Sequence, residues 1–238
     1  MLRASEGGDT IAAVIVEPVA GSTGVLIPPV GYLDRLRKIC DAHGILLIFD
    51  EVITGFGRTG SAFGATRFDV LPDLICAAKG ITNGSVPMGA VFARHMIYDT
   101  VVHGAPAGIE LFHGYTYSGH PLAAAAGLAT LDLYREENLF EKTKELEEKW
   151  ADAIMSLKGQ PNVVDIRTLG LVAAIDLAPH ADGVGKRAYE AMDKGFRDHG
   201  IMLRITADTI ALTPPLIISD NEVDELLTKL KAVIKAVA

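Results

Sequence analysis

The sequence is poor in cysteine and in positive charge, and it contains no long apolar run. Its 238 residues include two cysteines, Cys40 and Cys76, too few for a disulfide framework or a thiolate metal site, so we expect two buried, reduced thiols. The formal net charge of -8 argues against a nucleic-acid or anionic-membrane partner, because either would favour a basic surface. No segment approaches the roughly 18 consecutive apolar residues of a membrane span.

Two further signals are missing. The opening residues, MLRASEGGD, lack the apolar core of a secretory signal, so we expect a cytoplasmic protein. His113 and His120 lie close together in the sequence, but two histidines without further ligands do not predict a metal site. What remains, with 49% apolar and 22% charged residues, is the composition of an ordinary soluble globular protein.

The first half of the chain alternates strand-like and helix-like segments. Helical spacing over residues 30–43 predicts a helix ending at Gly44, with one buried stripe made of Leu33, Leu36, Ile39 and Cys40. Helical connections between apolar strands indicate a parallel α/β sheet. A further helix is predicted over 121–135. Four short apolar runs predict strands buried on both faces: 11–16, 45–49, 74–78 and 88–93.

The second half reads as a smaller α+β domain, which gives predicted domains of 1–136 and 137–238. Its last helix is expected to begin at Ser219, because Glu222 follows at the spacing of a capping box. The buried stripe of that helix is predicted to contain Val223, Leu226, Leu227, Leu230 and Ile234. The other expected elements are helices near 138–158 and 184–199 and strands near 163–167, 170–177, 201–205 and 209–213.

The run LLIFDEVITGFGRTG, residues 46–60, contains glycines at 55, 57 and 60 with the spacing G-x-G-x-x-G. A dinucleotide-binding loop needs its first glycine at the strand end and a helix opening near the last one. Here DEVIT separates the strand from Gly55, and no sustained helical stripe follows Gly60. The pattern therefore favours a sharply turning loop beside a site over a nucleotide cradle.

Asp50 and Lys79 each follow an apolar run, 45–49 and 74–78 respectively. Because ligands of open α/β sheets collect at the carboxyl ends of the strands, neighbouring strands would deliver an acid and an amine to one edge. The alternatives are that Asp50 only polarises a turn and that Lys79 is a solvent-facing loop lysine. Taken together, the pair fits pyridoxal phosphate, which needs a lysine amine and a carboxylate facing its pyridine nitrogen.

Four ordered motifs resemble those of class III pyridoxal-phosphate aminotransferases, and most of all the omega-amino-acid:pyruvate (β-alanine:pyruvate) transaminases. The resemblance runs from about Ile11 to the C-terminus and implies the α/β architecture of fold type I enzymes, here part of the large mainly parallel-sheet domain followed by a smaller α+β C-terminal domain. The motifs are VEPVAGSTGVLIPP, LLIFDEVITGFGRTG, DLICAAKGITNGSVPMGA and HGYTYSGHP.

The resemblance also implies roles for single residues around the cofactor. It makes Lys79 the Schiff-base lysine and Asp50 the partner of the pyridine nitrogen, with Val52 packed on the ring, two residues on and so on the same face of an extended chain. Tyr115 and Thr116 match the segment that the family lends to the phosphate of the neighbouring subunit's cofactor, which implies a homodimer with shared sites. Read without the resemblance, Val52 is an ordinary core valine and Thr116 a loop hydroxyl that caps a turn.

Two residues are matched to the substrate. Arg204 corresponds to the family's mobile arginine, which grips the keto acid carboxylate, as a guanidinium can with two parallel hydrogen bonds; the sequence alone would read it as a strand-edge surface arginine. Glu17 occupies the position where related enzymes pair a glutamate with that arginine. Ala207 departs from the family, which usually has glycine there, and this bears on how freely the loop carrying Arg204 can move.

The resemblance implies transamination from an omega-amino acid or amine, such as β-alanine, to pyruvate. A class III aminomutase of the glutamate-semialdehyde type would use the same lysine and acid, and a truncated, non-catalytic remnant is a further alternative. Family members are much longer, so we expect this chain to correspond to the C-terminal portion. We also expect the isolated chain to bind the cofactor weakly and not to turn over, because the Gly/Ser-rich phosphate loop lies in the other half.

Overall fold

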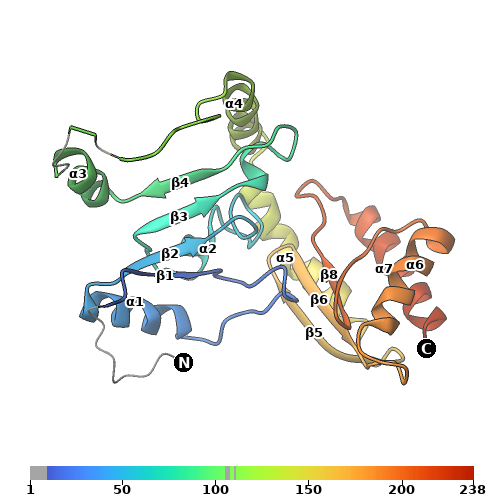
Figure 1. Cartoon of the computed structure of the whole chain (residues 1–238). Helices are drawn as coiled ribbons and strands as arrows, with labels where there is room; N and C mark the ends of the chain where they lie inside the picture. Colours follow the sequence, from blue (N-terminus) through green and yellow to red (C-terminus); the bar gives the residue numbers. More distant parts are fainter. Residues whose placement is uncertain (1–9, 105–107, 110) are drawn as a thin grey trace. The chain divides into compact units, whose positions relative to one another are not determined.

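The computed structural model describes residues 10–104, 108–109 and 111–238, and these divide into two compact units (Figure 1). The first unit includes Pro28–Phe56 and Phe63–Glu137 as well as the described residues up to Pro18. The second unit is Val19–Ile27, Gly57–Ala62 and Asn138–Ala238. The sequence predicted a single division after residue 136, and it gave no sign that two short early segments would join the C-terminal unit.

The first unit is built on a four-stranded sheet in the order β1-β2-β3-β4. The first three strands are parallel and β4 is antiparallel to β3, which agrees with the mainly parallel sheet that the resemblance implied. The connection from β3 to β4 contains a short 3-10 turn, η2 (Lys79–Ile81), and no crossover helix, so β4 runs back along β3. The strands are β1 (Ala13–Val16), β2 (Leu46–Asp50), β3 (Leu74–Ala77) and β4 (Ala90–Ala93).

Helix α1 (Tyr32–His43) packs its apolar side on the sheet and ends at Gly44, which has φ 63, as the sequence predicted. Leu33 and Cys40 are buried in one cluster with Leu47 and Phe49 of β2. Ile39, however, is 45% exposed, so the predicted stripe is correct only in part. The other helices of this unit are α2 (Gly64–Arg67), α3 (His95–His103), which was not predicted, and α4 (Pro121–Glu136).

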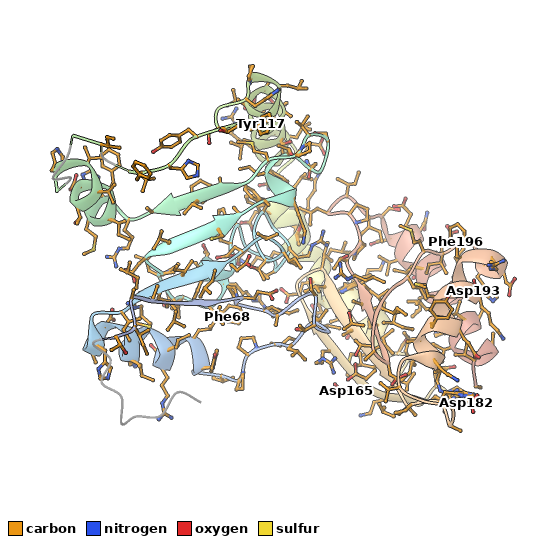
Figure 2. The ribbon with its side chains drawn as sticks, viewed as in Figure 1. Phe68, Tyr117, Asp165, Asp182, Asp193 and Phe196 are labelled. Carbon is orange, nitrogen blue, oxygen red and sulfur yellow. The ribbon has the colours of Figure 1, made fainter. Side chains whose placement is uncertain are left out.

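The prediction that the strands are buried on both faces is wrong for the two edge strands. Ile15 of β1 is 60% exposed and Val91 of β4 is 64% exposed. Large apolar side chains are also exposed in the segment before α4, where Figure 2 labels Tyr117, and along α4 itself. No helix within the described ranges is both long and apolar enough to cross a membrane.

The second unit has an antiparallel sheet in the order β5-β6-β8-β7. Its core is formed by β6, β8 and the inner faces of the helices, with Trp150, Ile175 and Ile210 all fully buried. The final helix begins with the predicted capping box between Ser219 and Glu222. The elements are α5 (Leu139–Met155), β5 (Val163–Leu169), β6 (Val172–Leu177), α6 (Lys186–His199), β7 (Arg204–Thr206), β8 (Thr209–Leu212) and α7 (Asp220–Ala236).

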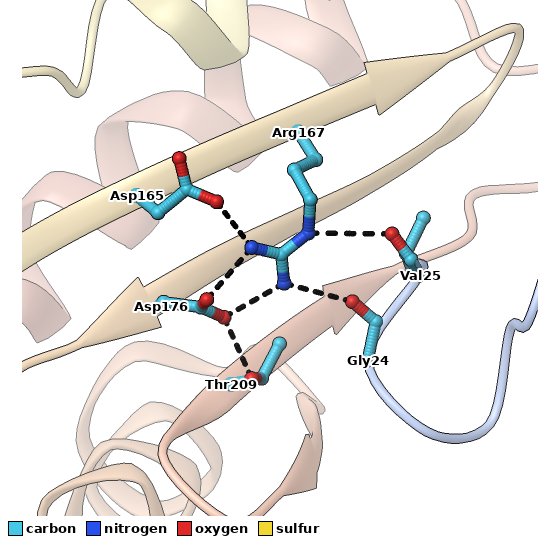
Figure 3. Close-up of polar contacts among 6 residues, drawn as sticks. All are labelled: Gly24, Val25, Asp165, Arg167, Asp176 and Thr209. Carbon is cyan, nitrogen blue, oxygen red and sulfur yellow. Dashed lines mark hydrogen bonds and ion pairs between the residues drawn. The ribbon is translucent and has the colours of Figure 1, made fainter. Parts of the chain in front are cut away.

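Hydrogen bonds from Arg167 of β5 join the segment Val19–Ile27 to this sheet (Figure 3). Its guanidinium meets both carboxylate oxygens of Asp176 at 2.7 and 2.9 Å. The same group donates to the Gly24 carbonyl at 2.9 Å and to the Val25 carbonyl at 3.3 Å. Thr209 donates to Asp176 at 2.6 Å. One side chain therefore joins the sheet to a segment more than 140 positions earlier in the chain.

Arg58 joins its own segment, Gly57–Ala62, to the rest of the second unit. It donates to the carbonyl oxygens of Leu171 at 2.9 Å and Pro214 at 2.6 Å. Gly170 lies so close to this segment that an added Cβ would stand 2.4 Å from the carbonyl carbon of Thr59. Both early segments are thus integral parts of the second unit.

The stability of the second unit should depend on Asp176. Its hydrogen bonds from Arg167 lower the pKa of this carboxyl below its ordinary value, with a further contribution from Thr209. Because the folded pKa is depressed, the stabilisation is present above the ordinary aspartate pKa and is lost as the pH falls through the lowered value. Asp176→Asn should therefore reduce the free energy of unfolding at neutral pH by about 1–3 kcal/mol. It should also make that free energy less dependent on pH in the acidic range.

The measurement is urea unfolding at a series of pH values from neutral to acidic. Asp152→Asn, which changes an exposed aspartate of α5, is the matched control and should leave the curve unchanged. Equal effects of the two substitutions would show that the Arg167–Asp176 pair does not stabilise the unit.

Candidate functional site

The pairing of β2 with β3 brings Asp50 and Lys79 to one edge of the first unit's sheet, as the sequence predicted. In the parallel register Asp50 is the partner of Cys76, and the Glu51 amide donates to the Cys76 carbonyl at 2.9 Å. Lys79 opens η2 three residues after Cys76. The acid therefore lies at the carboxyl end of one strand and the amine just beyond the carboxyl end of its neighbour.

Asp50 is half-buried at the last position of β2. Its Oδ1 accepts a hydrogen bond from the Val52 amide at 3.1 Å. Burial raises the pKa of the neighbouring Cys76 thiol, and the charge of Asp50 raises it further, so the described surroundings favour the neutral thiol. Both cysteines are free, Cys40 buried and Cys76 half-buried.

Val52 does not lie on an extended chain. It belongs to the turn that follows β2, and its amide points back to the Asp50 side chain. The expectation that alternation along a strand puts Val52 on the same face as Asp50 was therefore wrong. Its assignment to the cofactor ring rests on the resemblance alone and stays a prediction.

Lys79 is exposed and has φ 48, in the left-handed region. A non-glycine residue in this region costs about 1–3 kcal/mol and persists where its surroundings fix it. Its carbonyl accepts hydrogen bonds from the Thr82 and Gly84 amides, each at 3.2 Å. The side chain of Lys79 is accessible, so an aldehyde can reach it.

The glycine-rich segment after Asp50 is closed by Glu51, which is completely buried. The Glu51 carboxylate accepts hydrogen bonds from the Gly64 amide, from the Ala65 amide at 2.8 Å and from the Thr54 hydroxyl at 2.9 Å. These amides open the single-turn helix α2. The donors that a phosphate would need here are thus bonded within the chain, which agrees with the rejection of a nucleotide cradle.

Burial raises the pKa of Glu51, and its three hydrogen bonds partly offset that rise. No role of its own was predicted for Glu51 from the sequence. The sequence contained one signal for this burial. Side chains alternate along a strand, so the second of two adjacent acids points to the opposite face of the sheet. Glu51 is therefore the site-supporting residue that the sequence reading missed.

The predicted phosphate-side residues lie in an exposed segment, residues 111–120 of the first unit. Tyr115 has φ 52, and its amide donates to His113 Nδ1 at 2.8 Å. Thr116 is exposed beside it. Glu17 directly follows β1, and because Val16 pairs with Phe49, it lies level with Asp50 at the carboxyl edge of the sheet. No described contact joins Tyr115 or Thr116 to Asp50, so their roles stay predictions.

Arg204 belongs to the second unit, where it begins the edge strand β7 and is exposed. It lines a mainly apolar pocket of about 810 Å³ together with Met202, Pro214 and Leu226. Ala207, in the turn between β7 and β8, has φ 48. This conformation favours glycine, which gives a physical reason for the glycine that the resembled family usually has at this position.

The residues at the edge of the first unit's sheet fit pyridoxal phosphate. Lys79 offers an accessible amine, and Asp50 offers a carboxylate at the neighbouring strand end. Among the described residues, neither Lys79 nor Asp50 forms an ion pair with another side chain of its unit. Within the described ranges, no three histidine, cysteine or acidic side chains gather in a way that could hold a metal ion.

Comparison with known proteins gives a consistent result. The model of the family "Aminotransferase class-III" matches residues 1–234. An omega-aminotransferase of Caulobacter vibrioides is 60% identical over 224 residues, which cover 94% of this chain and 51% of that protein. A beta-alanine--pyruvate aminotransferase of Pseudomonas aeruginosa is 48% identical over 230 residues, covering 96% of this chain and 51% of that protein.

Solved structures agree with the sequence relatives. An amine transaminase from an uncultivated Pseudomonas species, determined in its PLP-bound form, superimposes with a TM-score of 0.92 at 38% identity, covering 99% of this chain and 54% of the other. The chain thus spans about half the length of the relatives it matches. With the lysine and acid at one sheet edge and the fold of known transaminases, this chain belongs to the class-III aminotransferase family, whose cofactor is pyridoxal phosphate.

Proposed function

We propose that this chain forms part of an enzyme that transfers an amino group from an omega-amino acid or amine, such as β-alanine, to pyruvate. The observation that carries the proposal is the placement of Asp50 at the end of β2 and of Lys79 just after the end of β3, its parallel neighbour. The names of the relatives support the substrate class, since they include an omega-amino acid--pyruvate aminotransferase of Pseudomonas putida, 49% identical over 218 residues.

Two residues of the first unit would hold the cofactor and move the proton. Asp50 would face the pyridine nitrogen and, being negatively charged, favour its protonated form. Lys79 would hold the cofactor through Nζ and, once displaced by the amine substrate, take a proton from the substrate carbon and return it. The bound group would supply an electron-accepting ring that stabilises the charge left when that proton departs.

Arg204 would select the keto acid. Its guanidinium can bind the pyruvate carboxylate through two parallel hydrogen bonds. The exposed position of Arg204 beside an apolar pocket in the second unit supports this role, because such a pocket leaves room for substrates whose carbon chain lacks a nearby carboxylate. The pairing of Glu17 with an arginine is proposed on the resemblance only.

We further propose a cytoplasmic homodimer in which Tyr115 and Thr116 serve the partner subunit's cofactor phosphate. Support comes from their exposure, and from the exposed apolar side chains around them. Phe112 is 94% exposed and Tyr117 is 87% exposed. Large apolar side chains exposed in one segment favour contact with another protein surface.

The assignment of Lys79 can be tested by reductive trapping. With a saturating concentration of pyridoxal phosphate followed by borohydride, peptide mapping should find the label on Lys79. Lys79→Ala should abolish this capture and any visible absorbance of the adduct while leaving the fold intact, because the side chain is exposed. Lys38→Ala, at an exposed lysine of α1 in the same unit, is the control and should keep the Lys79 label. Labelling of Lys186 or Lys194 in place of Lys79 would refute the assignment.

The role of Arg204 can be tested by kinetics in an active polypeptide of the full length of its relatives. Arg204→Ala should raise the KM for pyruvate about 30-fold, because losing a charge-assisted, two-pronged bond costs about 2 kcal/mol. The KM for an uncharged amine should change little. Lys229→Ala removes another cation lining the same pocket and should affect neither substrate. Equal effects of Arg204→Ala on pyruvate and on the amine would show that Arg204 is structural.

A further inference from the structure

The backbone at Lys79 is held from several sides within the first unit. Its left-handed φ of 48 is stabilised on one side by the Thr82 and Gly84 amides, which bond its carbonyl. The Ile81 amide donates to the Ala78 carbonyl at 3.2 Å, which closes the turn on the other side of Lys79. These bonds are local, so by themselves they do not fix the turn against the rest of the unit.

Gly80 connects this turn to the glycine-rich segment after β2. A Cβ added at Gly80 would stand 2.7 Å from the Cβ of Phe56, a distance that real side chains do not adopt. Phe56 is buried and lies in the segment closed by Glu51. The peptide next to Lys79 is therefore pressed directly against an aromatic side chain, and only glycine fits there.

Tyr134 of α4 holds the same peptide from a second direction. Its hydroxyl donates to the Gly80 carbonyl at 2.7 Å, and the Asn83 side-chain oxygen lies 3.1 Å from it. Its ring stacks on Phe56, with centroids 5.9 Å apart and planes inclined by 16°. Tyr134 is only 5% exposed, so this hydroxyl is a buried donor that ends on the turn carrying the lysine.

We propose that Tyr134 is a positioning residue for Lys79, acting through the Gly80 carbonyl. The hydroxyl fixes the orientation of the peptide that follows Lys79, while the stacked ring keeps Phe56 against Gly80. Together they hold the left-handed turn that presents the amine at the sheet edge. The functional part of this proposal rests on the proposed role of Lys79. Its conformational part, that Tyr134 holds the turn, concerns only contacts within the first unit.

A simpler account would make Tyr134 an ordinary core residue. That account explains the ring, which packs among apolar groups, but not the direction of the hydroxyl. A buried hydroxyl needs some partner, and here the partner is a carbonyl one residue from Lys79, in a turn whose backbone conformation is otherwise unfavourable for lysine. Removing the hydroxyl alone separates the two accounts.

The experiment compares the chain with Tyr134→Phe and with Tyr32→Phe, which changes an exposed tyrosine of α1 in the same unit. The first readout needs no cofactor: amide hydrogen exchange at Thr82 and Gly84, whose amides bond Lys79. We expect Tyr134→Phe to speed this exchange about fivefold to tenfold, the effect of one lost hydrogen bond. The Leu47 amide, bonded to Asp73 in the same unit, should be unaffected, as should all three amides in Tyr32→Phe.

The second readout is the rate of borohydride-trapped labelling of Lys79 by pyridoxal phosphate, normalised to Lys38. We expect a fall of about fivefold to tenfold in Tyr134→Phe and none in Tyr32→Phe. Unchanged exchange and unchanged labelling in Tyr134→Phe would overturn the proposal. Faster exchange at Leu47 as well, with every lysine affected alike, would also overturn it, since the tyrosine would then be merely structural.

The two proposals fail in different ways. If an active polypeptide of the full length of the relatives shows no preferential labelling of Lys79, the proposed function is wrong. The exchange measurement still decides the positioning role in that case, because it is made without the cofactor.

Discussion

The parallel pairing of β2 with β3 is the constraint on which the site depends. Because the two strands run in the same direction and are in register at Asp50 and Cys76, whatever follows each strand must emerge at the same edge of the sheet. The acid comes at the end of one strand and the lysine shortly after the other. No later adjustment of side chains could bring them together if this pairing were antiparallel.

The two adjacent acids at the end of β2, Asp50 and Glu51, have different surroundings. Asp50 stays half-buried at the strand end, whereas Glu51 is fully buried and gathers the first amides of α2. This second carboxylate closes the glycine-rich segment, and Phe56 of that segment packs against the turn that carries Lys79. The glycines thus serve close packing, since Gly55 lies against Phe63 and Gly57 against Phe140 and Leu216, each within its own unit.

Local patterns in the sequence predicted much of the fold and the core of the site, but not the features that depend on distant segments. Gly44 and the Ser219–Glu222 capping box marked real helix ends, because such signals act over a few residues. The reversal of β4 and the exposure of Ile15 were missed, since apolar composition does not reveal strand direction or whether a neighbour covers the strand. The role proposed for Arg204 comes only from the resemblance, because an arginine at a strand edge has no local signature of substrate binding.

The attachment of Val19–Ile27 and Gly57–Ala62 to the second unit has a consequence for the order of folding. Their anchors include Arg167, Leu171 and Pro214, which leave the ribosome more than a hundred residues after the early segments. The first unit's sheet can pair as soon as β4 has been made, but these two loops must wait without their partners until most of the chain has been synthesised. Such long-range closures are slow. We therefore expect nascent chains arrested before β5 to expose both segments to proteases and chaperones.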